Sequence, residues 1–137
     1  MIRVVLDTNI LVSAYLRPKG TPAAILAAAM TGQFQMCISE AVLAEYREVL
    51  HRARFSIGEK RIDRGLSVIR KRSRLCKPSL KLVVSPDEDD NRLLECAHAA
   101  KAHYLVTGNT KDFPGRYKYT KIVSPKSFRQ MWDTGAI

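Results

Sequence analysis

Short apolar runs alternate along this chain with segments whose apolar residues recur at helical spacing. The runs cover residues 2–6, 34–38, 80–84, 104–107 and 121–123. A continuous apolar run of this length is typical of a strand that is buried on both faces of a parallel sheet. Strands that alternate with helices are joined by right-handed crossovers, which cover both faces of the sheet. The alternation therefore predicts an α/β fold with a central parallel sheet.

Small polar residues mark where the intervening helices begin. Thr8, Thr21, Ser39 and Ser124 each stand where a side-chain hydroxyl is expected to cap a helix, and a further helix is predicted over residues 88–101. Two of the predicted helices carry a single apolar stripe, which indicates that one side of each is buried. The stripes consist of Val42, Leu43, Tyr46, Val49 and Leu50 in one helix, and of Ile62, Leu66 and Ile69 in the next.

The size and composition of the chain favour one domain over residues 1–137, since 46% hydrophobic content supplies a core. The longest apolar stretches fall well short of the ~20 residues that a membrane-spanning helix needs. The N-terminus lacks the long apolar region of a signal peptide, so we expect a cytoplasmic protein. Cys37, Cys76 and Cys96 lie far apart in the sequence, which predicts reduced and buried thiols.

The positive charge of the chain is concentrated in one segment. The formal net charge is +10, and residues 51–81 contain 11 Lys or Arg against two acids. Such a field attracts polyanions, as expected of a nucleic-acid-binding protein. The alternative is a solvated helix face that only aids solubility. The candidate RNA-binding residues are Arg52, Arg54, Lys60, Arg61, Arg64, Arg70, Lys71, Arg72 and Arg74.

Asp7 directly follows the first apolar run, so it lies at the carboxyl end of a predicted central strand. Ligands of open parallel sheets bind beyond these strand ends, near the point where the strand order reverses. An aspartate that is withdrawn from water there needs a hydrogen bond, an ion pair or a cation. The alternative is that Asp7 merely caps the following helix.

Two further acids fall at the margins of buried stripes. Glu45 lies about 100° from the centre of its helix stripe, so its side chain can reach a cleft beside the core. Asp90 belongs to the densest acidic run, residues 87–91, in which Asp87 is suited to cap a helix. Asp90 also precedes Leu93 by three residues, which continues the buried stripe into the first turn of that helix. A purely structural role for the run and a surface position for Glu45 are the alternatives.

Three carboxylates from separate segments can thus meet at one end of the sheet. Such a cluster repels itself without a cation, and its oxygen ligands suit Mg²⁺ or Mn²⁺. These ions activate water and stabilise the oxygens of a phosphodiester under attack. With the basic segment, Asp7, Glu45 and Asp90 indicate metal-dependent cleavage of a phosphodiester.

The order of these motifs resembles that of PIN domains and is similar to VapC-like toxin ribonucleases of toxin–antitoxin pairs. The resemblance implies a three-layer α/β/α sandwich, metal-dependent RNA cleavage, a homodimer, and a small antitoxin that blocks the cleft. It places metal-binding acids at Asp7, Glu45 and Asp90, in a match that extends to about Phe113. The matched motifs are Val5 to Asn9, Ser39-Glu40 with Glu45, Asp87 to Asn91, and Tyr104 to Asn109, and the implied supporting residues are Thr8, Asn9, Ser39 and Thr107.

One position departs from the family pattern. The family commonly has a fourth acid where this chain has Asn109, and an amide oxygen there is a weak ligand without charge. Asp112 is the candidate substitute, and a surface role in its loop is the alternative. The departure favours a rival hypothesis, a non-catalytic RNA-binding or regulatory PIN-like domain. A receiver-like phosphoacceptor domain is less consistent, because the adjacent acids and the downstream lysine of that class are missing.

Overall fold

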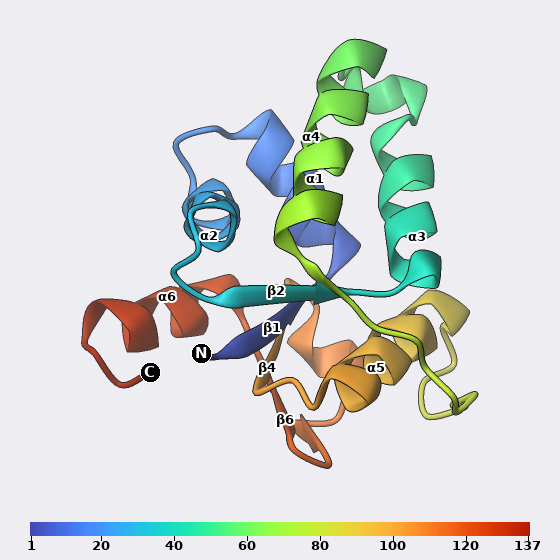
Figure 1. Ribbon diagram of the computed structural model, residues 1–137, viewed down its shortest axis with the longest axis vertical. Coiled ribbons are helices and arrows are strands. Elements are labelled where there is room, and N and C mark those ends of the chain that lie inside the picture. Colours follow the sequence, from blue (N-terminus) through green and yellow to red (C-terminus); the bar gives the residue numbers. More distant parts are fainter.

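Strand β1 lies at the centre of a six-stranded sheet in the computed structural model, which describes residues 1–137 (Figure 1). The strand order is β3-β2-β1-β4-β6-β5, and every pairing is parallel except that of β5 with β6. The strands are β1 (Arg3–Leu6), β2 (Gln35–Ile38), β3 (Arg74–Leu75), β4 (Tyr104–Val106), β5 (Arg116–Tyr117) and β6 (Thr120–Val123).

The strand order reverses between β1 and β4. From β1 the chain builds outward through β2 to β3, and it then returns to the other side of β1 with β4. Leu6 pairs with Val106, so both strands end at the same level, and Asp7 and Thr107 follow them directly. This pair of strand ends is the position at which open α/β sheets bind their ligands.

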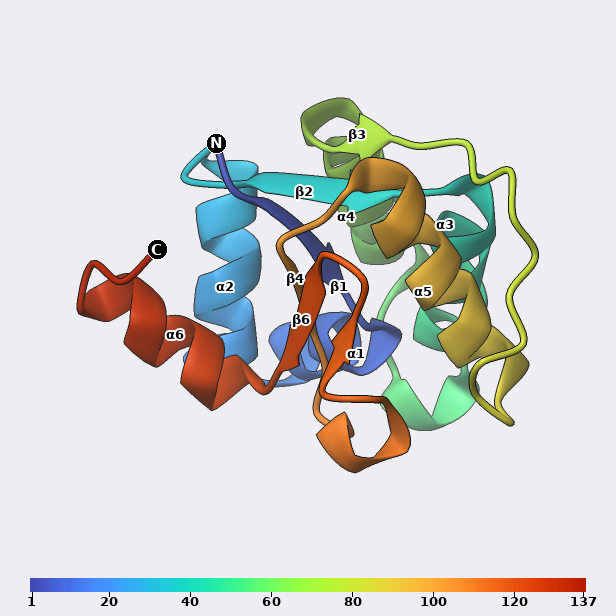
Figure 2. The same ribbon diagram turned by 90° about the horizontal axis from the view of Figure 1, so that it is seen from below.

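Helices cover both faces of the sheet and form a three-layer α/β/α sandwich. In Figure 1, α1 to α4 lie on one side of the sheet and α5 on the other, while α6 lies beside α2. In Figure 2, α1, η1, η2 and the first turn of α5 gather beyond one end of the strands. The elements are α1 (Thr8–Leu16), α2 (Thr21–Met30), α3 (Glu40–Leu50), η1 (Ala53–Phe55), α4 (Glu59–Arg72), α5 (Glu88–Ala100), η2 (Thr110–Asp112) and α6 (Pro125–Asp133).

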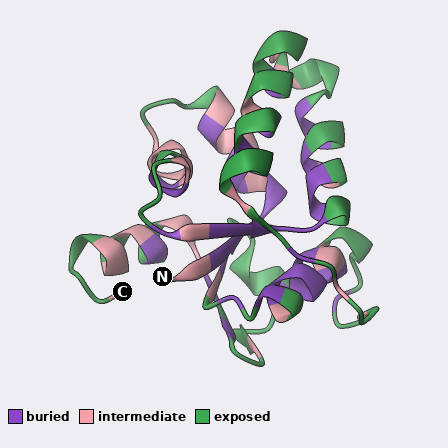
Figure 3. Ribbon diagram, viewed as in Figure 1, coloured by how far each residue is buried: buried purple, intermediate pink, exposed green.

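The core fills the spaces between the sheet and the helices. Val4, Val5 and Leu6 of β1 are completely buried, and the burial colours of Figure 3 follow the sheet and the helix sides that face it. Tyr46 of α3 is also fully buried, and its hydroxyl donates a hydrogen bond to the carbonyl oxygen of Leu6. Full burial of such side chains contributes about 1.5–3 kcal/mol each. The segment that leads to Asp7 is therefore held firmly.

Several sequence predictions are confirmed in detail. The fold class is as expected, and both predicted helix stripes are buried in α3 and α4. The hydroxyls of Ser39 and Ser124 cap α3 and α6 by accepting bonds from backbone amides. Asp87 caps α5 by accepting from the amide of Asp89. No helix is both long and apolar enough to cross a bilayer.

Three local predictions are wrong. The helices α1 and α2 begin one residue early, so Asp7 and Gly20, not Thr8 and Thr21, occupy the N-cap positions. Residues 80–84 are not a strand, because β3 next to β2 is formed by Arg74 and Leu75 instead. The backbone amides of this segment bond to side chains of α5 rather than to a neighbouring strand. Leu82 N donates to Glu95, and Val84 N and Ser85 N donate to Asn91.

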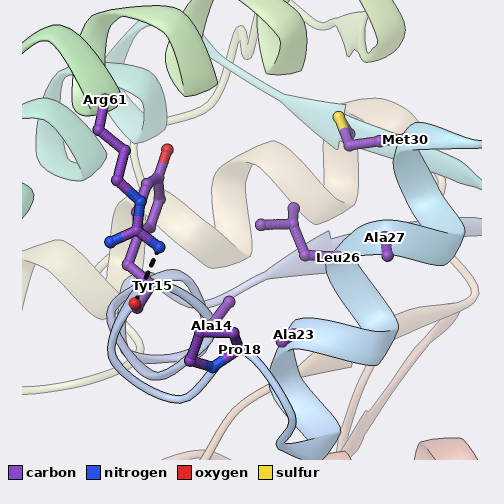
Figure 4. Close-up of a pocket in the computed structure, with 8 residues that line it drawn as sticks. All are labelled: Ala14, Tyr15, Pro18, Ala23, Leu26, Ala27, Met30 and Arg61. Carbon is purple, nitrogen blue, oxygen red and sulfur yellow. Dashed lines mark hydrogen bonds between the residues drawn. The ribbon is translucent and has the colours of Figure 1, made fainter.

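A close contact between α1 and α4 depends on a glycine. A Cβ atom added to Gly65 would lie 1.7 Å from the hydroxyl oxygen of Tyr15. The guanidinium of Arg61 lies over the ring of Tyr15, 4.8 Å from its centroid, and donates a 3.0 Å bond to the Tyr15 carbonyl oxygen (Figure 4). These groups border an apolar groove of about 310 Å³ between α1, α2 and α4. Gly65 therefore sets how closely the two helices approach.

We expect Gly65→Ala to lower the free energy of unfolding by about 1 kcal/mol, although alanine normally favours a helix by a similar amount. The cause is the displaced Tyr15 ring. In a Tyr15→Phe background the loss should be smaller, since the nearest ring carbon lies 3.0 Å from the added Cβ. Urea denaturation of the four chains measures this coupling. Equal losses in both backgrounds would contradict the packing account.

Candidate active site

Asp7 presents a buried carboxylate at the end of β1. It is 7% exposed, and its Oδ2 accepts a 2.7 Å hydrogen bond from the hydroxyl of Thr107. Asn9 donates a weaker 3.4 Å bond to the same oxygen. Asp7 occupies the N-cap position of α1, yet its side chain makes no capping hydrogen bond. A capping hydrogen bond therefore does not explain this carboxylate, although the nearby backbone amides of Asn9 and Thr8 lower its pKa.

Thr107 fixes the orientation of Asp7. Its side chain is fully buried, and its oxygen accepts a 3.0 Å bond from the amide of Asn109. The single hydroxyl proton is thereby directed to Asp7. Burial raises the pKa of Asp7, and the hydrogen bond from Thr107 lowers it. The carboxylate is thus held in one place at an electrostatic cost that a nearby positive charge would relieve.

A cleft of about 330 Å³ brings together acids from three separate elements. Asp7 comes from the end of β1, Glu45 from the middle of α3, and Asp90 from the first turn of α5. Like charges at this density repel one another, and an open cleft at the strand switch point gives a cation access to them. Of the residues singled out from the sequence, the cleft is lined by Asp7, Thr8, Asn9, Glu45, Arg52, Arg54, Asp90 and Asn109.

The pKa values of the two partly buried acids, Asp90 and Glu45, are raised by burial and by this clustering. The pKa of Asp90 is raised to about 7 by burial and by the charges of Asp87 and Asp7. Burial and the charge of Asp89, with which it shares a hydrogen bond, raise the pKa of Glu45 to about 7. Both shifts have the sign expected when carboxylates face one another in a poorly solvated cleft. The cleft therefore disfavours its own negative charge.

Four other sequence candidates lie near the cleft in different ways. Asp112 of η2 does not line it, although its charge contributes to the raised pKa of Asp90. Asn109 lines it at an exposed position. The Ser39 hydroxyl accepts a hydrogen bond from a backbone amide and so caps α3, the helix that carries Glu45. Thr107 lies behind Asp7 rather than in the wall of the cleft.

Of the lining residues that sequence reasoning did not place in the site, three are acidic or aromatic. Asp87 and Asp89 also face the cleft, although helix capping accounted for Asp87. Their membership of the acidic run was the available signal. Phe55 of η1 is the third, and it is the one aromatic side chain in the lining. Nothing in the sequence distinguished Phe55 from a core residue.

The basic residues divide into two groups. Arg52 and Arg54 follow α3 directly and line the acidic cleft. Arg61 instead stacks on Tyr15, and Arg70 forms a 2.7 Å ion pair with Glu40. The remaining candidates are exposed outside the cleft: Lys60, Arg64, Lys71, Arg72 and Arg74. Of the candidate basic residues, only Arg52 and Arg54 therefore bring positive charge into the wall of the cleft, and the exposed ones act on a polyanion through their long-range field.

The donor set of the cleft fits a hard divalent cation. Its acids and amides offer oxygen, and no Cys or His lines it, which suits Mg²⁺ or Mn²⁺. The hydroxyl of Thr8, 93% buried, has no hydrogen-bond partner in this cleft, and a bound ion with its water shell would supply one. The structure contains no group of three or more His, Cys, Asp or Glu side chains that is already close enough to hold a metal ion. The acids thus share a cleft but do not form a closed site by themselves.

Comparisons with known proteins bear on the family and the fold of the chain. A family model described as PIN domain matches residues 3–111. An uncharacterized protein of Methanocaldococcus jannaschii, MJ1680, is 32% identical over 127 residues, which cover 88% of this chain and 81% of that protein. A crystal structure of VapBC2 from Rickettsia felis, bound to a DNA fragment from their promoter, contains a similar chain. The TM-score is 0.63 at 22% identity, over 90% of this chain and 98% of that one.

We expect Asp90→Asn to stabilise the metal-free protein at pH 8. A raised pKa means that the folded chain keeps a proton which the unfolded chain releases, so stability falls as the pH rises from about 4 to about 7. Asparagine removes that loss. The gain at pH 8 should be about 1 kcal/mol, because water screens this half-buried group, and it should shrink at pH 5.

Urea denaturation in EDTA at the two pH values provides the measurement. Glu88→Gln is the matched control, since Glu88 is an exposed acid in the same helix turn and does not line the cleft. The control should gain nothing at pH 8. If Asp90→Asn were no more stable than the parent chain at pH 8, repulsion among these acids would be ruled out.

Proposed function

The chain belongs to the PIN-domain family, and from this premise we propose that it is a metal-dependent ribonuclease that hydrolyses RNA phosphodiester bonds. One observation carries the proposal. Asp7, Glu45 and Asp90 come from three different elements and line a single cleft beyond the point where the strand order reverses. Carboxylates in this position serve as ligands for the divalent cations that catalyse phosphodiester cleavage.

The acids would hold Mg²⁺ or Mn²⁺ in this cleft. When bound, such a cation supplies positive charge that makes water a better nucleophile and stabilises the phosphate oxygens under attack. Asp7 is the anchoring ligand in this proposal, because Thr107 already holds its carboxylate in place. Glu45 and Asp90 are the adjustable ligands, since both are only partly buried. No protein nucleophile is needed, because water attacks the phosphorus and the ribose oxygen leaves.

Arginine and hydroxyl groups of the cleft would position the RNA. Arg52 and Arg54 present guanidinium groups beside the acids, and the paired donors of this group match phosphate oxygens. The Thr8 hydroxyl, which has no other partner, donates to an oxygen of the reaction site. The exposed basic residues of α4 raise the local concentration of RNA around the molecule.

The proposed biological role is that of the toxin in a toxin–antitoxin pair. Support comes from the chain in the Rickettsia felis VapBC2 structure, whose fold this chain shares over most of its length. A small antitoxin protein is then the expected partner, and the homodimer expected from the sequence remains a prediction. Co-expression with a protein encoded beside this one, followed by relief of growth arrest, tests the assignment.

A non-catalytic RNA-binding domain is the second candidate function. Asn109 favours it, because an uncharged amide stands at a cleft position where the family commonly has an acid. This alternative predicts RNA binding that weakens with salt and no cleavage with any divalent cation. The nuclease proposal predicts cleavage that stops when EDTA is added.

We expect Asp7→Asn and Asp90→Asn each to reduce Mn²⁺-dependent RNA cleavage by at least a hundredfold, because each removes a charged ligand. Gel assays of the purified variants on structured and unstructured RNA provide the measurement. Glu88→Gln should cleave like the parent chain. Full activity in either cleft variant would show that the roles are misassigned.

We expect Asn109→Asp to bind Mn²⁺ more tightly, by roughly tenfold, because the substitution adds a charged oxygen ligand to the cleft. Isothermal titration of the full chain measures the change. Asp112→Asn is the comparison, since Asp112 does not line the cleft and its loss should matter less. A larger loss of affinity in Asp112→Asn than in Asp90→Asn would make Asp112 a ligand in place of Asp90.

A further inference from the structure

Phe55 is an aromatic side chain that the core does not use. Its ring is only partly buried and does not pack against the main hydrophobic cluster, whereas its neighbour Ile57 does. It lies instead in the wall of the acidic cleft. The other apolar residues of that wall, such as Val49 and Leu93, are buried and belong to helix faces that pack inward. Core packing therefore does not account for a phenylalanine at this place.

The guanidinium of Arg54 lies over this ring, with its Cζ atom 4.9 Å from the ring centroid. Arg54 forms no ion pair with any carboxylate, although the cleft beside it contains five acids. The charge is thus left without an ion pair, and the guanidinium lies over the aromatic ring. Aromatic rings and arginine guanidinium groups are both surfaces on which nucleic-acid bases stack.

The backbone directs this pair toward the acids. The helix α3, which carries Glu45, ends at Leu50, and the extended residue Arg52 leads directly into η1, so that Glu45 and Arg52 line the same cleft. Ser56 ends η1 with a left-handed φ of 51°, which turns the chain away toward α4. The short η1 therefore exposes Arg54 and Phe55 beside the carboxylates.

The cleft is large enough to hold part of an RNA strand. Its volume of about 330 Å³ lies at the lower end of the range for small-molecule sites, about 300–1,000 Å³. One nucleotide that has left its stack fits this space. A base that leaves its stack loses a favourable contact, which an aromatic platform replaces.

We propose that Arg54 and Phe55 form a stacking platform for the base next to the cleaved phosphate. This inference rests on the proposed ribonuclease function, and it adds the two residues that hold that base. Arg54 serves both the base and the adjacent phosphate, whereas Phe55 serves the base alone.

Binding without catalysis tests the platform. We would measure fluorescence anisotropy of a labelled twelve-nucleotide RNA of mixed sequence, single-stranded or paired with its complement, on the full chain in EDTA. Phe55→Ala should weaken binding of the single strand about tenfold, within the range that base–aromatic stacking supports, and leave the duplex unchanged. Phe55→Trp should bind as well as the parent chain. Phe55→Leu, which keeps apolar bulk without a ring, should resemble Phe55→Ala.

The salt dependence separates stacking from phosphate contact. Phe55→Ala should leave the slope of log affinity against log salt unchanged, whereas Arg52→Ala should reduce it by about one. Tyr119→Ala is the matched control, because Tyr119 is a highly exposed aromatic outside the cleft and should have no effect. A thermal melt of each variant shows whether it is folded, and Phe55→Leu replaces Phe55→Ala if the latter is not.

The platform is overturned if folded Phe55→Ala and Phe55→Leu bind the single strand like Tyr119→Ala, or if these variants weaken binding of the single strand and of the duplex equally. These outcomes are distinct from failure of the nuclease proposal. If the parent chain cleaves RNA and Phe55→Ala binds RNA as well as the parent chain, the ribonuclease proposal holds and the platform is wrong. If the parent chain never cleaves RNA, yet Phe55→Ala weakens its binding of single strands, the platform holds and the ribonuclease proposal is wrong.

Discussion

The hydrogen bond from Thr107 to Asp7 connects the ends of β1 and β4, the two strands between which the strand order reverses. The rest of the site is arranged around it. Val4, Val5 and Leu6 of β1 are completely buried, and the Tyr46 hydroxyl donates to the Leu6 carbonyl oxygen, so Asp7 has little freedom to move. The proton that Thr107 donates is committed because the amide of Asn109 occupies its oxygen. In the proposed function, a fixed and buried charge of this kind is the condition under which the remaining, less buried acids would gain by sharing a cation with it.

Sequence reasoning was strongest where the pattern was long or where a strand end fixed the place. The buried stripes of α3 and α4 and the position of Asp7 followed from apolar periodicity, and they in turn placed Glu45 beside the core. The strand predicted at residues 80–84 was wrong because an apolar run indicates burial but does not indicate which groups its backbone amides bond to. Glu95 and Asn91 take those hydrogen bonds, and a side-chain partner in another element leaves no periodic signal.

The cleft itself was only partly predictable. Asp89 could not be separated from the capping acids around it, because capping and ligand binding favour the same residues in the first turn of a helix. Phe55 carried no signal, since its meaning depends on which side of η1 meets the cleft. The charge of the basic segment was read correctly in total, but tertiary packing divides it between ion pairs, the stack on Tyr15, and the cleft.

The central claim is that separate acids share one cation in this cleft. Anomalous diffraction from a crystal soaked in Mn²⁺ tests it most directly. The account predicts a manganese peak within coordination distance of oxygens from both Asp7 and Asp90. A map with no peak in the cleft, or with manganese bound only by a single surface carboxylate elsewhere, would contradict it.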